Sequence, residues 1–310
     1  MSDREQFLLE RKQGIGGSDL AAVMGLSPWK TPLGVYLDKV SDIKNDNDDK
    51  HLKRGRRLER YILEEYAEDK KVGIKTDLPV FRDKDFPFLI GHVDGEVKEI
   101  DSAKDDKKVY VEAKSYWGNI SDWDGKIPDY YLPQVAHYAY LTDADRIDVA
   151  VLGNRWEYGC FSYYRNEEYE KKVKKIAIDF WNNHVLAKVP PKISSKEDAM
   201  LLYPEDDESV KHSSGEIDKS LILLAQLQSA RENIEKQEEL LKTNIKGYME
   251  SASILTSDKG YKVTWKMQTQ HRVNIDLLKK EEPEVYHRFV YNLNIRPFKF
   301  QPSKLSKENL

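Results

Sequence analysis

The stretch that decides the fold is residues 88–116, which read FLIGHVDGEVKEIDSAKDDKKVYVEAKSY. It consists of two apolar runs, and the hydrophilic segment 101–108 between them can turn the chain back on itself. Apolar and polar residues alternate in the second run, so Glu112 and Lys114 share one face of a strand. Asp94 lies near the end of the first run, and a hairpin would therefore bring two acids and a lysine together.

These three side chains have two interpretations. In the first, Glu112 and Lys114 form an exposed pair on a surface hairpin, which contributes little to stability. In the second, they are buried for a purpose, because burying such groups is costly. Asp94 and Glu112 would then be hard oxygen ligands suited to Mg²⁺. Lys114 would orient or help deprotonate a metal-bound water. The second interpretation, a phosphodiester-cleaving site, needs further parts of a site elsewhere in the chain.

Composition places the chain among soluble proteins with a sizeable core. It has 310 residues, of which 39% are hydrophobic and 34% charged. This length suits one domain or a domain with an appendage. The single cysteine, Cys160, excludes a disulfide framework and a cysteine-based zinc site. We find no apolar stretch of membrane-spanning length and no signal peptide at the polar start, so we expect a cytoplasmic protein.

The net charge of −4 counts against a protein that coats nucleic acid, since such proteins are usually basic. Any contact with DNA would therefore come from a metal bridging to phosphate or from local basic patches. One such patch consists of Lys53, Arg54, Arg56, Arg57 and Arg60.

Residues 14–19 read GIGGSD and precede a short helix at 20–24. We expect Ser18 to be its N-cap and Gly25 its C′ residue. The first amides of a helix have no backbone partner and point toward an anion, so Gly17 and Ser18 are candidates for binding phosphate. The alternative is an ordinary loop and cap. The segment is not a Walker A loop, because no Gly-Lys-Ser/Thr follows.

A stronger helix is predicted at 53–69, and one of its acids is out of place. Glu59 falls inside the apolar arc, whose other members are Leu58, Ile62, Leu63 and Tyr66. An acid on the core side is the kind of violation expected at a functional site. The alternative is an acid at the edge of the arc that a neighbouring arginine satisfies.

The remaining elements predict a mixed α/β core. We expect strands at 77–82, 88–97, 109–116, 146–153 and 156–164, and helices at 7–12, 33–40, from Pro133 onward and 167–189. Gln134 and Tyr138 are four residues apart and share a helical face. We divide the chain into a core at 1–190, a connector at 191–216 and an extension at 217–310 packed on the core. The extension comprises a helix at 221–250, a strand at 261–267 and a helix at 276–291.

The order of these pieces resembles the PD-(D/E)xK nuclease superfamily. More narrowly, residues 7–190 resemble the YqaJ-type viral recombinases, which are relatives of the lambda exonuclease group. The pieces that carry the resemblance are residues 14–19, 25–29, 55–59, 91–95, 112–114 and 134–138. Val93 stands where the superfamily name has proline, a position that many members vary.

The resemblance implies a restriction-endonuclease-like core, in which a mixed central sheet is flanked by helices. It also implies an exonuclease that digests one strand of linear duplex DNA from the 5′ end. The cofactor would be Mg²⁺, with Mn²⁺ as a substitute and two ions per site. The 3′ single strands would pass to a single-strand annealing protein of the RecT or Bet type during phage recombination. Relatives of the lambda type form ring trimers, and the host would be a bacterium or its prophage.

The resemblance also assigns roles to residues of this chain. Asp94 and Glu112 match metal ligands, the carbonyl of Ala113 completes the metal site, and Glu59 matches an acid near the second metal. Lys114 matches the residue that positions the attacking water. Gln134 would help to place the water or substrate, with Tyr138 as support.

Arg11 and Ser18 match residues that bind a terminal 5′ phosphate, and Gly17 lies beside them. Lys30 or Trp29 would touch the DNA end, the lysine through phosphate and the tryptophan by stacking. A core position for Trp29 is the alternative.

Two other functions stay open on the sequence. A restriction or repair nuclease of the same fold would cut internally and need no 5′-phosphate pocket, so Arg11 and Ser18 discriminate against it. A non-catalytic DNA-binding protein would have no reason to keep Glu59, Asp94, Glu112 and Lys114 together.

Overall fold

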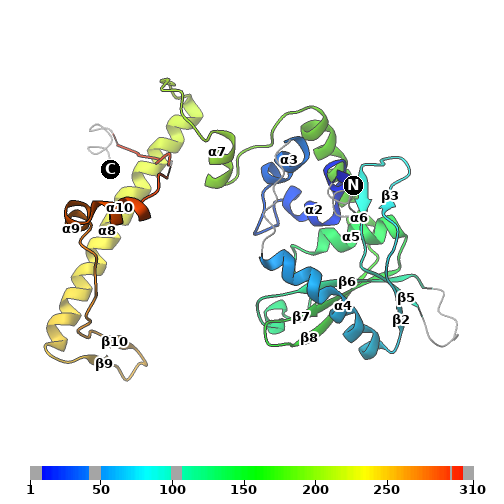
Figure 1. Ribbon diagram of the computed structural model, residues 1–310, viewed down its shortest axis with the longest axis horizontal. Coiled ribbons are helices and arrows are strands. Elements are labelled where there is room, and N and C mark those ends of the chain that lie inside the picture. The colour runs from blue at the N-terminus through cyan, green and yellow to red at the C-terminus, as the bar shows by residue number, and fades with distance from the viewer. Residues whose placement is uncertain (1–8, 42–49, 99–106, 294, 303–310) are drawn as a thin grey trace. The chain divides into compact units, whose positions relative to one another are not determined.

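The computed structural model describes residues 9–41, 50–98, 107–293 and 295–302 (Figure 1). The chain forms two compact units, Met1–Leu202 and Tyr203–Leu310. Each is considered by itself. Most of the expected turn at 101–108 lies outside the described residues.

A five-stranded mixed sheet is the centre of the first unit. Its strand order is β2-β5-β6-β7-β8, with β6 and β7 parallel and the other neighbours antiparallel. The strands are β2 (Gly73–Lys75), β5 (Gly95–Lys98), β6 (Val109–Ser115), β7 (Arg146–Leu152) and β8 (Tyr158–Tyr164). The pairing of β5 with β6 confirms the predicted hairpin.

Helices cover both faces of this sheet (Figure 1). They are α4 (Lys50–Lys70) on one face, and α5 (Leu132–Thr142) with α6 (Glu167–Phe180) on the other. Val111 packs in one cluster with Ile62 and Tyr66 of α4. Val149 packs in a second cluster with Val135 of α5. A mixed sheet between helices is the predicted fold class, and the prediction is confirmed.

A second sheet joins the N-terminal segment to this core. Its three strands have the order β1-β4-β3, which are Ile15–Gly16, Leu89–Gly91 and Phe81–Arg82. The predicted strands at 77–82 and 88–97 are therefore wrong in extent. The segment 88–97 forms two strands, β4 and β5, which belong to separate sheets. Residues 92–94 between them cross from one sheet to the other. Asp94 belongs to this crossing and not to a strand.

Residues 9–12 are helical, within the helix predicted at 7–12, whereas the next helix begins earlier than predicted. Helix α2 spans Gly17–Val23 and its N-cap is Gly16, so Ser18 is inside the first turn and the predicted N-cap is wrong. The reason is Asp19, whose carboxylate accepts a hydrogen bond from the Gly16 amide at 3.2 Å. Gly25 has a φ of +71° just beyond the helix, as a C′ residue requires.

The end of the first unit differs from the predicted connector. Helix α3 (Pro32–Val40) is capped by Thr31, whose hydroxyl donates to Asp198 at 2.5 Å. Asp198 lies on α7 (Lys196–Leu202), which thereby joins the first unit. Helix α6 ends in a π-helical turn at Trp181–Leu186.

The second unit is built on the long helix α8 (Gly215–Met249). A hairpin of β9 (Ile254–Thr256) and β10 (Lys262–Thr264) follows, and then α9 (Ile275–Glu281) and α10 (Pro283–Phe289). The single final helix predicted at 276–291 is wrong, because Pro283 has no N–H to continue α9 and instead starts α10. Packing of this unit on the core stays a prediction.

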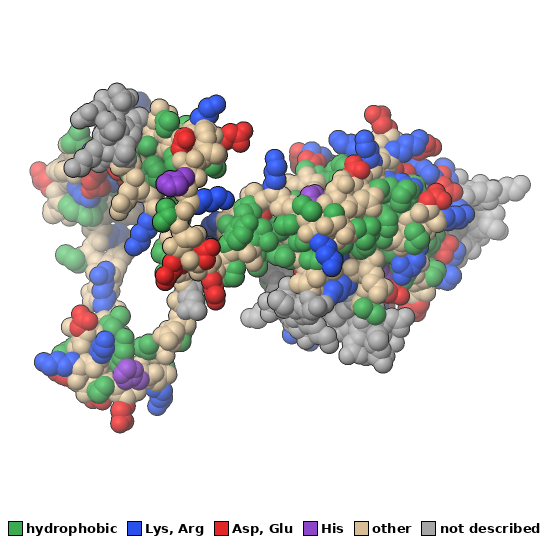
Figure 2. Space-filling view, turned by 90° about the horizontal axis from the view of Figure 1, so that it is seen from above, with side chains coloured by type: hydrophobic (Ala, Val, Ile, Leu, Met, Phe, Trp, Pro, Cys, Tyr) green, Lys and Arg blue, Asp and Glu red, His purple; other side chains and the backbone are tan. Residues whose placement is uncertain are grey.

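Charges are mixed over the surface. Figure 2 shows Lys and Arg side chains interspersed with Asp and Glu on both units, in keeping with the small net charge. Within the described residues, no helix is both long and apolar enough to cross a membrane.

Candidate active site

Strand β6 places an acid and a lysine side by side beneath α5. Glu112 is 4% exposed, and its Oε1 accepts a hydrogen bond from Lys114 Nζ at 2.7 Å. Val111 faces the opposite way, into the α4 cluster. The predicted alternation is confirmed, and the interpretation as an exposed surface pair is wrong because Glu112 is buried.

Gln134 of α5 completes a closed set of hydrogen bonds with this pair. Its Oε1 accepts from Lys114 Nζ at 3.0 Å, and its Nε2 donates to Glu112 Oε1 at 2.6 Å. The same Nε2 lies 3.0 Å from the hydroxyl of Tyr138, one helical turn further on. Gln134 therefore holds the acid and the lysine in fixed positions, and Tyr138 supports Gln134.

Asp94 enters the site from the crossing between the two sheets. The ladder between β5 and β6 ends at the pair of Gly95 with Val111, and beyond it the amide of Ala113 donates to Asp94 Oδ2 at 2.8 Å. The carboxylate takes over where the strand pairing stops, which satisfies a backbone donor that would otherwise be unpaired.

The two acids repel each other inside the protein. Burial, followed by the charge of Asp94, raises the pKa of Glu112 to about 8. Burial also raises the pKa of Asp94, against the opposing effect of Lys114. Burial alone would lower the pKa of Lys114, but the charges of Glu112 and Asp94 raise it above its usual value. Additional positive charge, such as that of a cation, would therefore stabilise the ionised form of these two acids.

Glu59 reaches the same region from α4. It is half-buried, and its pKa is raised first by burial and then by the charge of Asp94. The predicted violation of the apolar arc is thus an acid within the electrostatic reach of the cluster.

The donor atoms fit a hard divalent cation. Glu112 Oε2 is buried with no hydrogen-bond partner among the described residues, and the charge of Asp94 acts on the Glu112 carboxyl. In the part of the chain that the structure describes, no three His, Cys, Asp or Glu side chains form a complete cage. Two carboxylates with few other protein ligands suit Mg²⁺, which retains several waters. Ala113 lies between the two acids along the chain.

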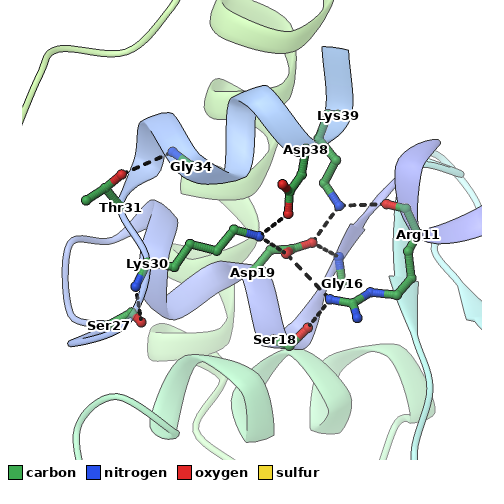
Figure 3. A network of polar contacts seen from close by, with 10 residues as sticks. All are labelled: Arg11, Gly16, Ser18, Asp19, Ser27, Lys30, Thr31, Gly34, Asp38 and Lys39. Atoms are coloured by element: carbon green, nitrogen blue, oxygen red, sulfur yellow. Dashed lines mark hydrogen bonds and ion pairs between the residues drawn. The ribbon is translucent and has the colours of Figure 1, made fainter. Parts of the chain in front are cut away.

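Arg11 and Ser18, which sequence analysis paired as phosphate ligands, are in contact (Figure 3). One terminal nitrogen of the Arg11 guanidinium donates to Ser18 Oγ at 3.0 Å and lies 3.9 Å from Asp19 Oδ1. The arginine comes from the segment before β1 and the serine from α2. The fold therefore places a guanidinium and a hydroxyl together.

A buried ion pair beneath them was missed by sequence analysis. Lys39 Nζ of α3 lies 2.7 Å from Asp19 Oδ2 and donates to the backbone oxygen of Arg11 at 2.6 Å (Figure 3). Burial would raise the pKa of Asp19, but Lys39, Lys30 and Arg11 lower it to about 2. The available signal was a lysine on the apolar face of the 33–40 helix, three residues after the buried Tyr36.

Lys30 belongs to the same cluster but has an acid of its own. Its Nζ lies 2.5 Å from Asp38 Oδ2 and 3.8 Å from Asp19 Oδ1 (Figure 3). The cluster has three cations, Arg11, Lys30 and Lys39, against the two carboxylates of Asp19 and Asp38, so its formal charge is 3 − 2 = +1.

Gly17 lies beside Ser18 and packs against Gln134 and Tyr138 of α5. A Cβ at Gly17 would lie 2.7 Å from the Tyr138 ring and 2.9 Å from Gln134 Cγ, so a side chain there has no space. The start of α2 therefore packs directly on the two α5 residues that support Glu112 and Lys114. The predicted role of Gly17 in phosphate binding is accompanied by this steric requirement.

Trp29 is not a core residue. It is 68% exposed and packs edge-on against Tyr130, with their ring centroids 5.0 Å apart. Its next neighbour, Tyr131, lies under Lys114 Nζ at 5.2 Å from the ring centroid. An exposed aromatic surface therefore borders the site.

Lys39→Met is expected to destabilise the protein by about 3–5 kcal/mol, because it leaves the buried Asp19 carboxylate without its main partner. Lys171→Met is the matched control, since its pair with Glu167 along α6 is exposed and contributes little to stability. Urea unfolding measures both values. Equal losses in the two variants would contradict the structural role of the Asp19–Lys39 pair.

The same pair predicts an acid dependence of stability. The folded pKa of Asp19 is depressed from 3.8 to about 2. Its stabilising contribution is therefore present above pH 4 and is lost as the pH falls toward 2, a difference of about 2 kcal/mol. Asp19→Asn should not lose this contribution, and unfolding curves of both proteins between pH 5 and 2 measure the difference. Parallel curves would contradict the assignment.

Comparison with known proteins gives a match within the first unit. Residues 6–145 match the YqaJ-like viral recombinase domain. The resemblance inferred from the motifs is thereby confirmed. Each predicted site residue, from Arg11 to Tyr138, falls inside the YqaJ-like domain, whereas the resemblance was expected to extend to residue 190.

The full chain has a relative of similar length. It is 25% identical over 312 residues to the protein YqaJ of Bacillus subtilis (strain 168), which spans 95% of this chain and 93% of the relative. The similarity thus includes the second unit, beyond the YqaJ-like domain.

Two solved structures are similar to part of the chain. An alkaline exonuclease from Laribacter hongkongensis has a TM-score of 0.49 and 15% identity, covering 60% of this chain and 94% of that protein. A phage-related exonuclease from Haemophilus somnus 129PT has a TM-score of 0.42 and 12% identity, covering 56% of this chain and 96% of that protein.

Proposed function

We propose that this protein is a Mg²⁺-dependent exonuclease that digests linear duplex DNA from its 5′ ends and leaves 3′ single strands for phage-type recombination. The observation that carries the proposal is the hydrogen-bonded set of Glu112, Lys114 and Gln134, with Asp94 bound to the Ala113 amide beside it. Glu112 and Gln134 of this set are buried. The match to a viral recombinase domain supports it.

Each side chain has a task in this proposal. Asp94 and Glu112 would hold the metal, with the Ala113 carbonyl and Glu59 as further ligands. Two Mg²⁺ ions, or Mn²⁺ in their place, would supply an activated water and stabilise the leaving oxygen. Lys114 holds the attacking water against the scissile phosphate and offsets negative charge there. Gln134 fixes the orientation of Lys114, and its own position is fixed by Tyr138.

The basic cluster around Arg11 supports the proposed 5′→3′ direction of digestion. A 5′→3′ enzyme must seat the terminal phosphate before the first scissile bond can reach the acids. Arg11 and Ser18 offer a guanidinium and a hydroxyl for this purpose, and Lys30 and Trp29 lie on the same side of the fold. Gly17 links this seat to Gln134 and Tyr138, so the two parts of the site are rigidly spaced.

Duplexes with a 5′ phosphate are expected to be degraded faster than duplexes with a 5′ hydroxyl. Charge-assisted hydrogen bonds contribute roughly 1.5–3 kcal/mol, which corresponds to about a 10- to 150-fold preference at subsaturating DNA. Arg11→Ala or Ser18→Ala should reduce the preference. Lys171→Ala is the control for loss of a surface cation, since Lys171 is exposed and pairs along α6 with Glu167. Initial rates on end-labelled duplexes measure the effect.

The same assay decides between the proposal and its alternatives. Cleavage of linear DNA with Mg²⁺ or Mn²⁺, and none with EDTA, supports the metal-dependent exonuclease. Equal cleavage of closed circular DNA would contradict it and favour an internally cutting restriction or repair nuclease. No cleavage with any divalent ion would favour a non-catalytic DNA-binding protein.

The biological setting follows from the products. We propose a cytoplasmic protein of a bacterial host or prophage, which hands its 3′ strands to a single-strand annealing protein of the RecT or Bet type. A ring trimer around the DNA is part of this proposal. Analytical ultracentrifugation tests the trimer, and co-purification with a co-expressed annealing protein tests the partner.

A further inference from the structure

A basic, aromatic hollow lies next to the candidate site on the α4 side of the sheet. Its volume is about 520 Å³, within the range of about 300–1,000 Å³ typical of ligand sites. The lining residues are Lys53, Arg54, Arg57, Leu58, Trp117, Asn154 and Trp156. Among these described residues there are three cations and no acid, although the whole chain is acidic. Such a local surplus of positive charge attracts a polyanion.

Two indoles in the hollow are unusually exposed. Trp117 is 51% exposed and Trp156 is 68% exposed. Trp156 has a φ of +61°, in the left-handed region that a large side chain rarely occupies. Tyr61 of α4 packs edge-on against it, with centroids 5.8 Å apart. A strained backbone that displays a large aromatic ring to solvent indicates a binding role.

Arg54 connects the charge to the aromatic surface. Its guanidinium carbon lies 4.4 Å from the centroid of the Trp117 ring. A guanidinium stacked in this way keeps its charge and its in-plane N–H donors, which can bind phosphate oxygens. Arg54 and Arg57, on the same face of α4, therefore line the hollow with phosphate-binding groups above a stacking surface.

The hollow is close to the cleavage chemistry. On α4, Arg57 precedes Glu59 by two residues, so their backbones are about 3 Å apart along the helix while their side chains leave it on different sides. After β6, Trp117 follows Lys114 by three residues, a path of at most about 11 Å. A strand emerging from the acid cluster would need only a few nucleotides to reach the indoles, at about 3.4 Å of rise for each.

We propose that this hollow binds single-stranded DNA, with bases stacked on Trp117 and Trp156 and phosphates held by Lys53, Arg54 and Arg57. Unpaired bases are required, because the bases of a duplex are stacked inside and have no free face for an indole. The proposal depends on the proposed function only for the source of the strand, which is a duplex end opened at the cleavage site. Binding of the strand itself needs no nuclease activity.

The test is fluorescence anisotropy of labelled dT12 in EDTA, so that no cleavage occurs. Trp117→Ala and Trp156→Gly should each weaken binding by about 5- to 150-fold, the usual effect of removing a stacking platform. Trp156→Phe should restore most of the affinity. Arg57→Gln should reduce the slope of log K against log salt by about 0.7, the loss of one phosphate contact on a single strand. Trp265→Ala, which removes an exposed indole in the second unit, should leave dT12 binding unchanged.

Thermal unfolding shows whether a variant loses DNA binding merely because it is unfolded. Trp156→Gly should melt no lower than the wild type, since glycine adopts a positive φ without strain. Wild-type affinity for dT12 in the Trp117→Ala/Trp156→Gly double variant would overturn the inference. So would a 12-base-pair duplex that competes as well as unlabelled dT12, because the hollow would then be a general polyanion surface.

The outcomes separate this inference from the proposed function. If the wild type degrades linear duplex DNA but the indole variants bind dT12 normally, only the inference fails. If the wild type binds dT12 through the indoles but cuts no DNA, only the nuclease proposal fails.

Discussion

Asp94→Asn and Glu112→Gln are each expected to reduce DNA cleavage with Mg²⁺ by at least about 10³-fold. Each change removes a charged oxygen ligand from the cluster, and a catalytic metal is worth several kcal/mol of transition-state stabilisation. Initial rates on linear duplex DNA at saturating Mg²⁺ measure the loss. Glu96→Gln is the matched control, since this acid lies on the neighbouring strand β5 and pairs with Lys98.

The stability of Glu112→Gln should not fall with its activity. Glu112 is buried beside another acid, which raises its pKa to about 8. A neutral glutamine avoids this burial of charge, so Glu112→Gln should melt at the same temperature as the wild type or higher when no metal is added. An inactive protein that is at least as stable identifies a functional acid. Wild-type turnover in either variant would exclude the site.

Lys114→Ala is expected to lose about 10²- to 10⁴-fold in rate, the range for a positioned proton-transfer group. The side chain sits between Glu112 Oε1 and Gln134 Oε1, so its ammonium has one position relative to the acids. Single-turnover kinetics measure the rate, and calorimetry measures the affinity for Mg²⁺. We expect the affinity to change much less than the rate.

Lys98→Ala is the control for this variant, because Lys98 pairs with Glu96 on an exposed strand. Complete loss of Mg²⁺ binding in Lys114→Ala would show that the lysine maintains the metal site and does not position the water.

The parts of the site that follow local rules could be predicted from the sequence. Strand alternation put Glu112 and Lys114 on one face, and helical spacing put Gln134 and Tyr138 on another. Both patterns have a fixed period, so they can be recognised in the sequence without knowledge of the fold. The apolar arc of α4 located Glu59 by the same reasoning. The resemblance to a known family supplied the pairing of Arg11 with Ser18.

The parts that depend on packing between distant elements could not be predicted. The ion pair of Asp19 with Lys39 joins two helices, and no periodicity within either helix names its partner. The apolar run that leads to Asp94 predicts one strand at 88–97, but the chain changes sheets at residues 92–94. Gly16 and not Ser18 is the N-cap of α2, because the carboxylate of Asp19 accepts a hydrogen bond from the Gly16 amide. The break at Pro283 was predictable from its missing N–H and was overlooked.

The change of sheets at residues 92–94 has a consequence for how the candidate site forms during folding. Asp94 is held between β4, which pairs with β1 through Ile15 and Leu89, and β5, which pairs with β6. Its position therefore depends on both sheets, and Ile15 of the N-terminal segment pairs with Leu89 over a sequence separation of 74 (89 − 15). Arg11, just before β1, and Asp94, just after β4, therefore both depend on one non-local pairing, a kind of contact that forms slowly during folding.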